Sequence, residues 1–376
     1  MAVKLLSLWL GLVLLVPAMA QSQQQVEVST AAERQQLQQQ LEQSRTLEQR
    51  LDLLVRLTEV FVTQDPALSL TYARQWLDSS TDRESTLYHR ILLQQTTAFM
   101  LQGNYQQAYH TSLEIERLAR IQKDTKQLFN ALRRQADNLN RLGQADKALP
   151  KALEAMQIAV DANNAVPLQI IRYDLAHIYM NLYAYPQAIQ IASDGLTLAM
   201  TGEDTNRQAN FLHLLAEASR LYQQYQSAED FARKALELRL ARQEQALIAQ
   251  YHLSLGRTLL AQHKYQESEQ QLQFALSAAQ HVSNRIEQAD ALQSLAWLDL
   301  HFDRVEQANS KYQQITELLH QDEYKSNFQR FSLRHLSALL EFSLPDQAAA
   351  LYTKLALQSA DFAEPQLLLD FWLVTA

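Results

Sequence analysis

Residues 175–192 read LAHIYMNLYAYPQAIQIA, and their pattern recurs along the chain at a step of 40 residues. Leu175 and Tyr179 are spaced as on one face of a helix, and Tyr185 and Ala188 repeat such a spacing after a short break. The small residue equivalent to Ala188 is found at Ala108, Ala148, Ala188, Ala228, Ser268, Ala308 and Ala348. A fixed step that is kept over most of a chain predicts a structural repeat.

Each copy of the repeat contains two amphipathic segments. Apolar residues four apart form one stripe, as in Leu247, Tyr251, Leu255 and Leu259, and a second stripe follows from Tyr265 to Ala279. Helix-breaking residues such as Gly103-Asn104 separate the two segments, and pairs such as Asn163-Asn164 separate the copies. We therefore expect an all-α protein built of antiparallel helix pairs, which cross closely at the small residues. Pro150 departs from the pattern, and predicts a kink or a late helix start.

The composition supports helices and excludes several classes of protein. The 376 residues include only 6 Gly and 7 Pro, too few for a protein of many strands and turns, and 49 Gln. The lack of cysteine excludes disulfides and thiol chemistry. With 33 basic and 41 acidic residues, the chain has no electrostatic reason to bind nucleic acid.

Sequence motifs of the common enzyme classes are missing. The chain contains no G-x-x-x-x-G-K-[ST], G-x-G-x-x-G, G-x-S-x-G or H-E-x-x-H. We therefore expect no catalytic residues and no cofactor, and the protein is predicted not to be an enzyme.

The first twenty residues have the form of a targeting signal. Lys4 precedes an apolar run from Leu5 to Val16, and Ala18-Met19-Ala20 has the small-x-small pattern of a cleavage site. We expect residues 1–20 to be a secretory signal peptide, cut before Gln21, and the mature chain to be periplasmic or secreted. An uncleaved anchor is the alternative, although the run is short for crossing a bilayer.

Three further regions follow. Residues 21–47 are a Gln-rich leader, which we expect to be either disordered or a polar helix. Residues 48–360 hold about eight copies of the repeat. Residues 361–376 are largely apolar and are expected to form a capping helix, because a repeat array must cover its last hydrophobic face.

The repeat resembles the tetratricopeptide repeat (TPR). The order Leu175-Ala176-x-x-Tyr179, then Tyr185-x-x-Ala188, is similar to the consensus of that family. The usual TPR period is 34 residues, so this chain looks like the long variants with a 40-residue period found in secreted bacterial sensor and regulator proteins. The resemblance implies a right-handed α-solenoid. HEAT and armadillo repeats, whose period is near 40, are the alternative architecture.

The resemblance also implies a binding groove, because the first helix of each TPR copy lines the concave face. The corresponding residues are Asn130, Arg133, Asp137, Asn140, Tyr173, His177, Asn210, His213, Glu217, Arg257 and Trp297. Polar groups beside aromatic rings would suit a protein or peptide partner. The alternative is a solvated helix face with i,i+4 ion pairs such as Arg133–Asp137. The Lys–Asn clamp by which some TPR proteins hold a terminal carboxylate is not reproduced, and Arg133 and Arg257 replace it only loosely.

Three of these residues are of types that could hold a metal ion. His177, His213 and Glu217 fall on neighbouring first helices, and three such side chains can hold a divalent ion. Because His–Glu pairs more often form a hydrogen bond, we expect no metal.

Two hypotheses for the function remain open. The first is a non-catalytic extracytoplasmic scaffold that binds a protein or peptide in its groove. The alternative is a sensory input module that acts with, or is truncated from, a membrane-bound signalling protein such as a diguanylate cyclase or histidine kinase. That alternative implies a membrane-protein partner, although the mature chain itself would not insert into the membrane.

Overall fold

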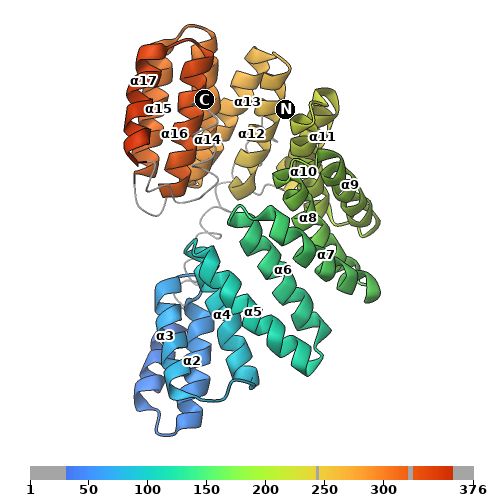
Figure 1. Cartoon of the computed structure of the whole chain (residues 1–376), viewed down its shortest axis with the longest axis vertical. Helices are drawn as coiled ribbons and strands as arrows, with labels where there is room; N and C mark the ends of the chain where they lie inside the picture. Colours follow the sequence, from blue (N-terminus) through green and yellow to red (C-terminus); the bar gives the residue numbers. More distant parts are fainter. Residues whose placement is uncertain (1–30, 243–244, 321–324, 359–376) are drawn as a thin grey trace, which may run out of the picture. The chain divides into compact units, whose positions relative to one another are not determined.

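The computed structural model describes residues 31–242, 245–320 and 325–358 (Figure 1). The expected signal peptide and capping helix lie outside these ranges. Helices fill almost all of the described chain, and no strand occurs in it. None of the described helices is long and apolar enough to span a membrane. The expected all-α class is therefore confirmed.

The helices alternate as the repeat predicts, with a first and a second helix in each copy. The first helices are α2 (Leu47–Phe61), α4 (Thr86–Leu101), α6 (Thr125–Arg141), α8 (Ala165–Asn181), α10 (Thr205–Leu221), α12 (Gln245–Ala261), α14 (Arg285–His301) and α16 (Lys325–Glu341). The second helices are α3 (Pro66–Ser79), α5 (Tyr105–Gln122), α7 (Ala145–Asp161), α9 (Tyr185–Thr201), α11 (Tyr225–Arg242), α13 (Tyr265–His281), α15 (Val305–Leu319) and α17 (Pro345–Gln358). Within the Gln-rich leader, residues 31–43 are also helical.

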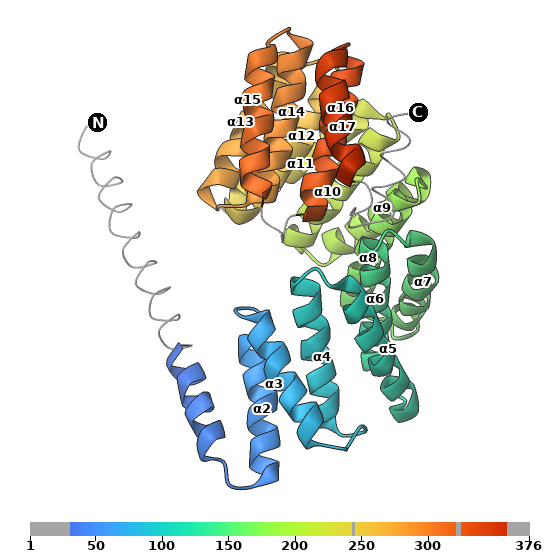
Figure 2. The same cartoon turned by 60° about the vertical axis from the view of Figure 1, so that its left-hand side comes forward.

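The chain divides into two compact units between Ala131 and Leu132, within α6. In the first unit, buried apolar side chains of α2 to α5 form one core, to which Leu37 of the leader also belongs. In the second unit, a large core extends from α12 to α16, and α14 packs beside α15 (Figure 2). Each copy thus buries its apolar stripes against the next copy.

The repeated small residues lie where helices cross. Ala188 and Ala228 are 0% exposed, as the pattern predicts. Pro150 lies inside α7, which begins at Ala145 like the other second helices, so the expected late start is wrong. Loss of one N–H in the second turn does not prevent the helix from starting, because the surrounding packing holds it in place.

Within the second unit, the first helices lie closer to one another than the second helices do. Contacts join α8 to α10, α10 to α12, α12 to α14 and α14 to α16, whereas no two described second helices make contacts of that extent. The first helices therefore form the inner side of the stack. We call the surface that their shared face forms the first-helix groove, because the TPR resemblance implies a groove there.

Candidate functional site

Each of the groove residues expected from the sequence is partly exposed, which a binding surface requires. Asn130 belongs to the first unit, and the other ten lie in the second unit. The groove is therefore described from Arg133 to Trp297.

At its N-terminal end, the groove is held together by polar contacts between neighbouring first helices. Arg133 Nε of α6 donates to Asp174 Oδ2 of α8 at 2.7 Å. Two turns along the same helices, Asn181 Nδ2 donates to Asn140 Oδ1 at 2.9 Å. The alternative of a solvated helix face gave Arg133–Asp137 as an example of an i,i+4 pair; Asp137 forms such a pair with Arg141 at 2.9 Å. These contacts cross the groove floor and link successive copies.

Aromatic rings follow in the middle of the groove. The Tyr173 ring lies 4.8 Å from His177 and 6.1 Å from Phe211 of α10, both edge to face. His213 lies 5.1 Å from the Tyr251 ring of α12. Burial, and then the nearby His213, lower the pKa of His177 to about 4, and burial also lowers the pKa of His213. Both imidazoles are therefore neutral at neutral pH.

Two carboxylates lie near these histidines, and their pKa values are shifted in opposite directions. Burial raises the pKa of Asp174 to about 6, although Arg133 opposes the shift. Burial alone would also raise the pKa of Glu217, but Arg220, His213 and hydrogen bonds outweigh it and lower that pKa to about 2. Glu217 accepts from Arg220 at 2.8 Å and from Ser254 at 2.6 Å. It is thus a fixed negative charge in the groove.

Asn210 has an orientation that its neighbours determine. Its Oδ1 accepts from Arg239 Nη2 at 2.5 Å and from the Tyr251 hydroxyl at 3.0 Å. Because a guanidinium can only donate, Arg239 fixes which end of the amide points inward. Among the described residues the Asn210 Nδ2 group has no partner, and it is not buried. The N–H donors of the amide are therefore available to a further acceptor.

At the C-terminal end of the groove, charged side chains lie near aromatic rings. Asp290 of α14 lies between Arg257 of α12 and Arg334 of α16 and binds both. Two turns further along α14, Trp297 Nε1 donates to Glu341 at 3.1 Å, and the indole stacks on His301 with 5.4 Å between centroids. This end offers cations beside an aromatic surface.

The metal site that the sequence suggested as one possibility was His177, His213 and Glu217. Among the described residues, no group of three His, Cys, Asp or Glu side chains is placed to hold a metal ion. Glu217, one of the three possible ligands, accepts hydrogen bonds from Arg220 and Ser254. The described groups of the groove offer hydrogen bonds, charges and aromatic surfaces to a partner.

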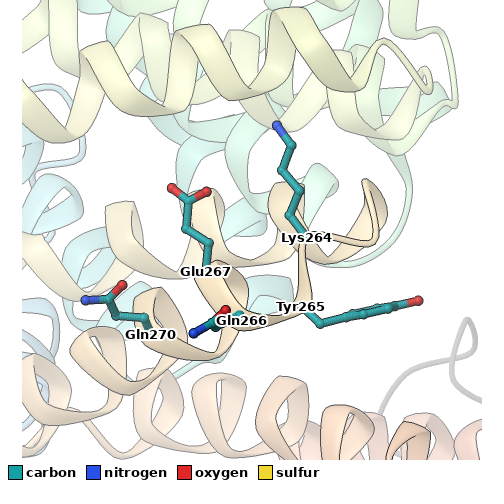
Figure 3. Close-up of a pocket in the computed structure, with 5 residues that line it drawn as sticks. All are labelled: Lys264, Tyr265, Gln266, Glu267 and Gln270. Carbon is teal, nitrogen blue, oxygen red and sulfur yellow. The ribbon is translucent and has the colours of Figure 1, made fainter.

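A separate open hollow lies at the start of α13 (Figure 3). It is lined by one short stretch, Lys264, Tyr265, Gln266, Glu267 and Gln270. Its charged groups already have partners, since Lys264 binds Glu229 at 2.6 Å and Glu267 binds Arg233. We therefore place the candidate site in the first-helix groove.

Several groove residues were not singled out from the sequence. They are Asp174, Asn181, Tyr251, Ser254, Ser294, Arg334 and Glu341. A signal for three of them exists, because Arg133–Asp174, Asn140–Asn181 and Asn210–Tyr251 are each separated by 41 residues. Facing residues on neighbouring first helices are thus one repeat plus one residue apart.

The helix pairs and their inner groove define the chain as a TPR-like helical repeat protein, as the sequence resemblance implied. No family model matches the sequence, and no curated protein does. Its neighbours among solved structures are TPR-like, so the TPR expectation is confirmed.

Three of these neighbours illustrate the likeness. A Rap protein complexed with competence and sporulation factor has a TM-score of 0.65 and 13% identity, over 89% of this chain and 92% of its own. NprR in complex with its cognate peptide NprX has a TM-score of 0.55 and 14% identity, over 88% and 98%. Aspartyl phosphate phosphatase F from Bacillus subtilis has a TM-score of 0.60 and 12% identity, over 86% and 87%. At such identities the likeness concerns the fold alone.

Proposed function

We propose that this chain is a non-catalytic extracytoplasmic binding protein, whose first-helix groove holds a peptide or an extended segment of a partner protein. The observation that carries the proposal is the fixed amide of Asn210, whose Nδ2 donors have no partner among the described residues. An extended peptide has backbone carbonyls that must find donors when they leave water. Asn210 offers such donors without first having to reorient.

The rest of the groove supports the same function. Tyr173 and Trp297 supply aromatic surfaces for side chains of the partner, and the contacts that link neighbouring first helices hold them in place. Because this network exists before binding, little conformational entropy is lost when a partner enters. A peptide is recognised in the same kind of fold by NprR, which was solved with its cognate peptide.

Two parts of the proposal rest on the sequence. The extracytoplasmic location follows from the signal-like residues 1–20 and from the lack of cysteine. The lack of turnover follows from the missing catalytic motifs, although one structural neighbour is named a phosphatase. The N-terminus of the protein recovered from its native cell, determined by mass spectrometry, tests whether the signal is cleaved: a start at Gln21 is expected, and a start at Met1 would contradict it.

Binding is tested with an isosteric change. Asn210→Asp keeps an oxygen for Arg239 and Tyr251 but removes the N–H donors. A peptide selected from a random display library on the wild-type protein should bind Asn210→Asp about tenfold more weakly, the loss expected for one good hydrogen bond. Asn206→Asp, an exposed position one turn earlier on α10, is the matched control and should bind normally. Equal binding by wild type and Asn210→Asp would contradict the proposed role of the groove.

A further inference from the structure

Asp174 of α8 is a poorly exposed acid that accepts a single hydrogen bond. Its side chain is 17% exposed, and Nε of Arg133 donates to its Oδ2 at 2.7 Å. In the described part of the chain no second group donates to this carboxylate. One hydrogen-bonded ion pair therefore joins α8 to α6 at this point.

Four comparable acids of the second unit each bind at least two groups that are cationic or donate hydrogen bonds. They are Glu217, Glu229, Asp290 and Asp299, whose side chains are 20%, 7%, 22% and 3% exposed. Hydrogen bonds and nearby cations favour the ionised form of a buried carboxylate, and burial opposes it. Asp174 is as poorly exposed as these acids but has less to keep it ionised.

The charged groups that act most strongly on Asp174 all lie on α6. Burial raises the pKa of Asp174 to about 6, and the neighbouring charge of Asp137 adds to the rise. Arg133 and Arg141 act in the opposite direction, and burial outweighs them. Asp174 can therefore take up a proton in weakly acidic solution while the chain stays folded.

The other helices that pack against α8 have weaker effects on Asp174. On α8 itself, the pKa of Tyr173 is raised to about 12 and that of His177 is lowered to about 4, so neither group changes its charge near pH 6. His213 and Glu217 of α10 act on His177. The helices α7 and α9 also pack against α8, and none of the groups that act most strongly on Asp174 belongs to them.

Arg133 has a second acid within reach on its own helix. Asp137 follows it by four residues on α6, a spacing at which side chains of a helix meet. Asp137 is 26% exposed and binds Arg141 through its Oδ1 at 2.9 Å. One carboxylate can bind two arginines, as Asp290 does elsewhere in the groove. Asp137 can therefore accept Arg133 without releasing Arg141.

We propose that Arg133 is the moving part of a pH-sensitive switch, which pairs with Asp174 of α8 at neutral pH and with Asp137 of α6 in weakly acidic solution. The proton comes from solvent and binds the carboxylate of Asp174. Neutral Asp174 then attracts the guanidinium less than ionised Asp137 does. In acid the two helices lose their ionic link, and the hydrogen bond from Asn181 to Asn140 remains.

The switch would regulate the N-terminal end of the first-helix groove, and this part of the inference rests on the proposed function. With the ionic link closed, α6 and α8 are held in place before a partner arrives, so that less conformational entropy is lost on binding. With the link open, this advantage decreases. A partner that contacts this end should therefore bind more tightly at neutral pH than in weak acid.

NMR of the full mature chain tests the switch without any partner. The signals of the Asp174 carboxyl carbon and of the Arg133 Nε–H group, identified by their loss in Asp174→Asn and Arg133→Gln, should shift together with a midpoint near pH 6. In Asp174→Asn the Arg133 signal should keep its acid position at every pH. Asp161→Asn is the matched control, because Asp161 is exposed and binds only within α7, and it should titrate like wild type. A midpoint at about pH 4, the ordinary value for aspartate, or an Arg133 signal that does not follow Asp174, would overturn the switch.

Asp137→Asn removes the second partner of Arg133. The midpoint of Asp174 should fall, because Asp137 helps to raise its pKa. The acid position of the Arg133 signal should also differ from that of wild type, since the guanidinium has no carboxylate to move to on α6. An unchanged acid position would overturn the role of Asp137.

Thermal unfolding distinguishes the switch from a purely structural ion pair. A carboxyl pKa that is raised by folding means that the folded state favours the protonated form. The contribution of Asp174 to stability therefore increases as the pH falls through about 6, and it is smallest at neutral pH. Asp174→Asn should unfold at no lower a temperature than wild type at pH 7.5. A clear loss of stability there would indicate a structural ion pair and overturn the switch.

The effect on binding is measured with a peptide whose own charge does not change between pH 5.0 and 7.5. It is selected at pH 7.5 from a random library without Asp, Glu or His, and both of its ends are blocked. Wild type should bind it at least about threefold more weakly at pH 5.0, whereas Asp174→Asn should bind it equally at both values. Equal binding by wild type, or a pH dependence that persists in Asp174→Asn, would overturn the regulation and leave the proposed function intact. If the library yields no binder, the proposed function fails, and the NMR titration still decides the switch.

Discussion

The absence of a side chain at Gly195 makes room for the ring of Phe211. A Cβ atom at Gly195 would lie 2.2 Å from that ring, far inside contact distance. Phe211 is 1% exposed, and its ring packs against Tyr173 of the groove. Gly195, on the second helix α9, thus leaves room for the ring that packs against Tyr173 of the groove.

Gly195→Ala is therefore predicted to lower the free energy of unfolding by about 1–3 kcal/mol, the usual cost of overpacking. This is expected although alanine favours a helix by about 1 kcal/mol over glycine. Gly202→Ala is the matched control, because its Cβ would meet only Leu198 O at 3.5 Å, and it should stay within about 0.5 kcal/mol of wild type. Urea unfolding measures both, and a Gly195→Ala variant as stable as wild type would contradict this account.

At the scale of the element, the turns repeat as regularly as the helices. A left-handed residue follows every first helix from α4 to α16, at Gly103, Gly143, Tyr183, Gln223, His263, Asp303 and Ser343, which are 40 residues apart. Four second helices are also followed by a left-handed residue, at Lys123, Asn163, Glu203 and Ser283. Only two of these are glycine, the residue that adopts this conformation without steric cost. The remaining turns hold strain that the helix packing compensates.

Glycine should therefore stabilise these turns. Glu203, with a φ of 53°, is exposed at the end of α9, and Glu203→Gly is predicted to raise the free energy of unfolding by about 0.5–1 kcal/mol. The same substitution at Glu237, exposed within α11, should lower it by about 1 kcal/mol, because glycine is a poor helix former. Chemical denaturation of the pair is the measurement, and destabilisation by both substitutions would contradict the strain at Glu203.

The helix pairs were predictable because apolar spacing and small residues specify them directly. The boundaries were harder: Gly103 and Gly143 mark their turns, whereas Tyr183 gives no sign that it adopts a left-handed conformation. Pro150 shows the same limit, since the packing of α7 overrides a local helix breaker. Local propensity predicts an element only where tertiary contacts agree with it.

The candidate site was also predictable only where it does not depend on contacts between helices. The repeat placed Asn210 and Glu217 on the first-helix face, but their partners depend on how neighbouring helices are offset. The sequence offered Asp137 of α6 as one possible partner of Arg133, but Arg133 binds Asp174 of α8. Arg334 of α16 was not predicted as a site residue, because it lies outside the positions that the TPR resemblance implies. It nevertheless binds Asp290 of α14.

At the scale of the whole molecule, the described chain consists of two repeat units, and the groove from Arg133 to Arg334 belongs to the second. Its polar contacts join α6 to α8, α10 to α12, and α12 through α14 to α16. The groove is thus a property of several stacked copies, and no single copy would present it. This dependence explains why a regular repeat, rather than a local motif, carries the proposed function.

The central claim is that a partner binds on the first helices and not on the second. A photo-crosslinking phenylalanine analogue placed at Tyr173 or at Trp297 probes the groove, and the same analogue at Phe274 probes an exposed aromatic position on α13. Each variant is expressed as the full chain in the native cell and irradiated, and the captured proteins are identified by mass spectrometry. The account predicts that both groove positions capture the same protein or peptide and that Phe274 captures neither. Capture from Phe274, with none from Tyr173 or Trp297, would contradict it.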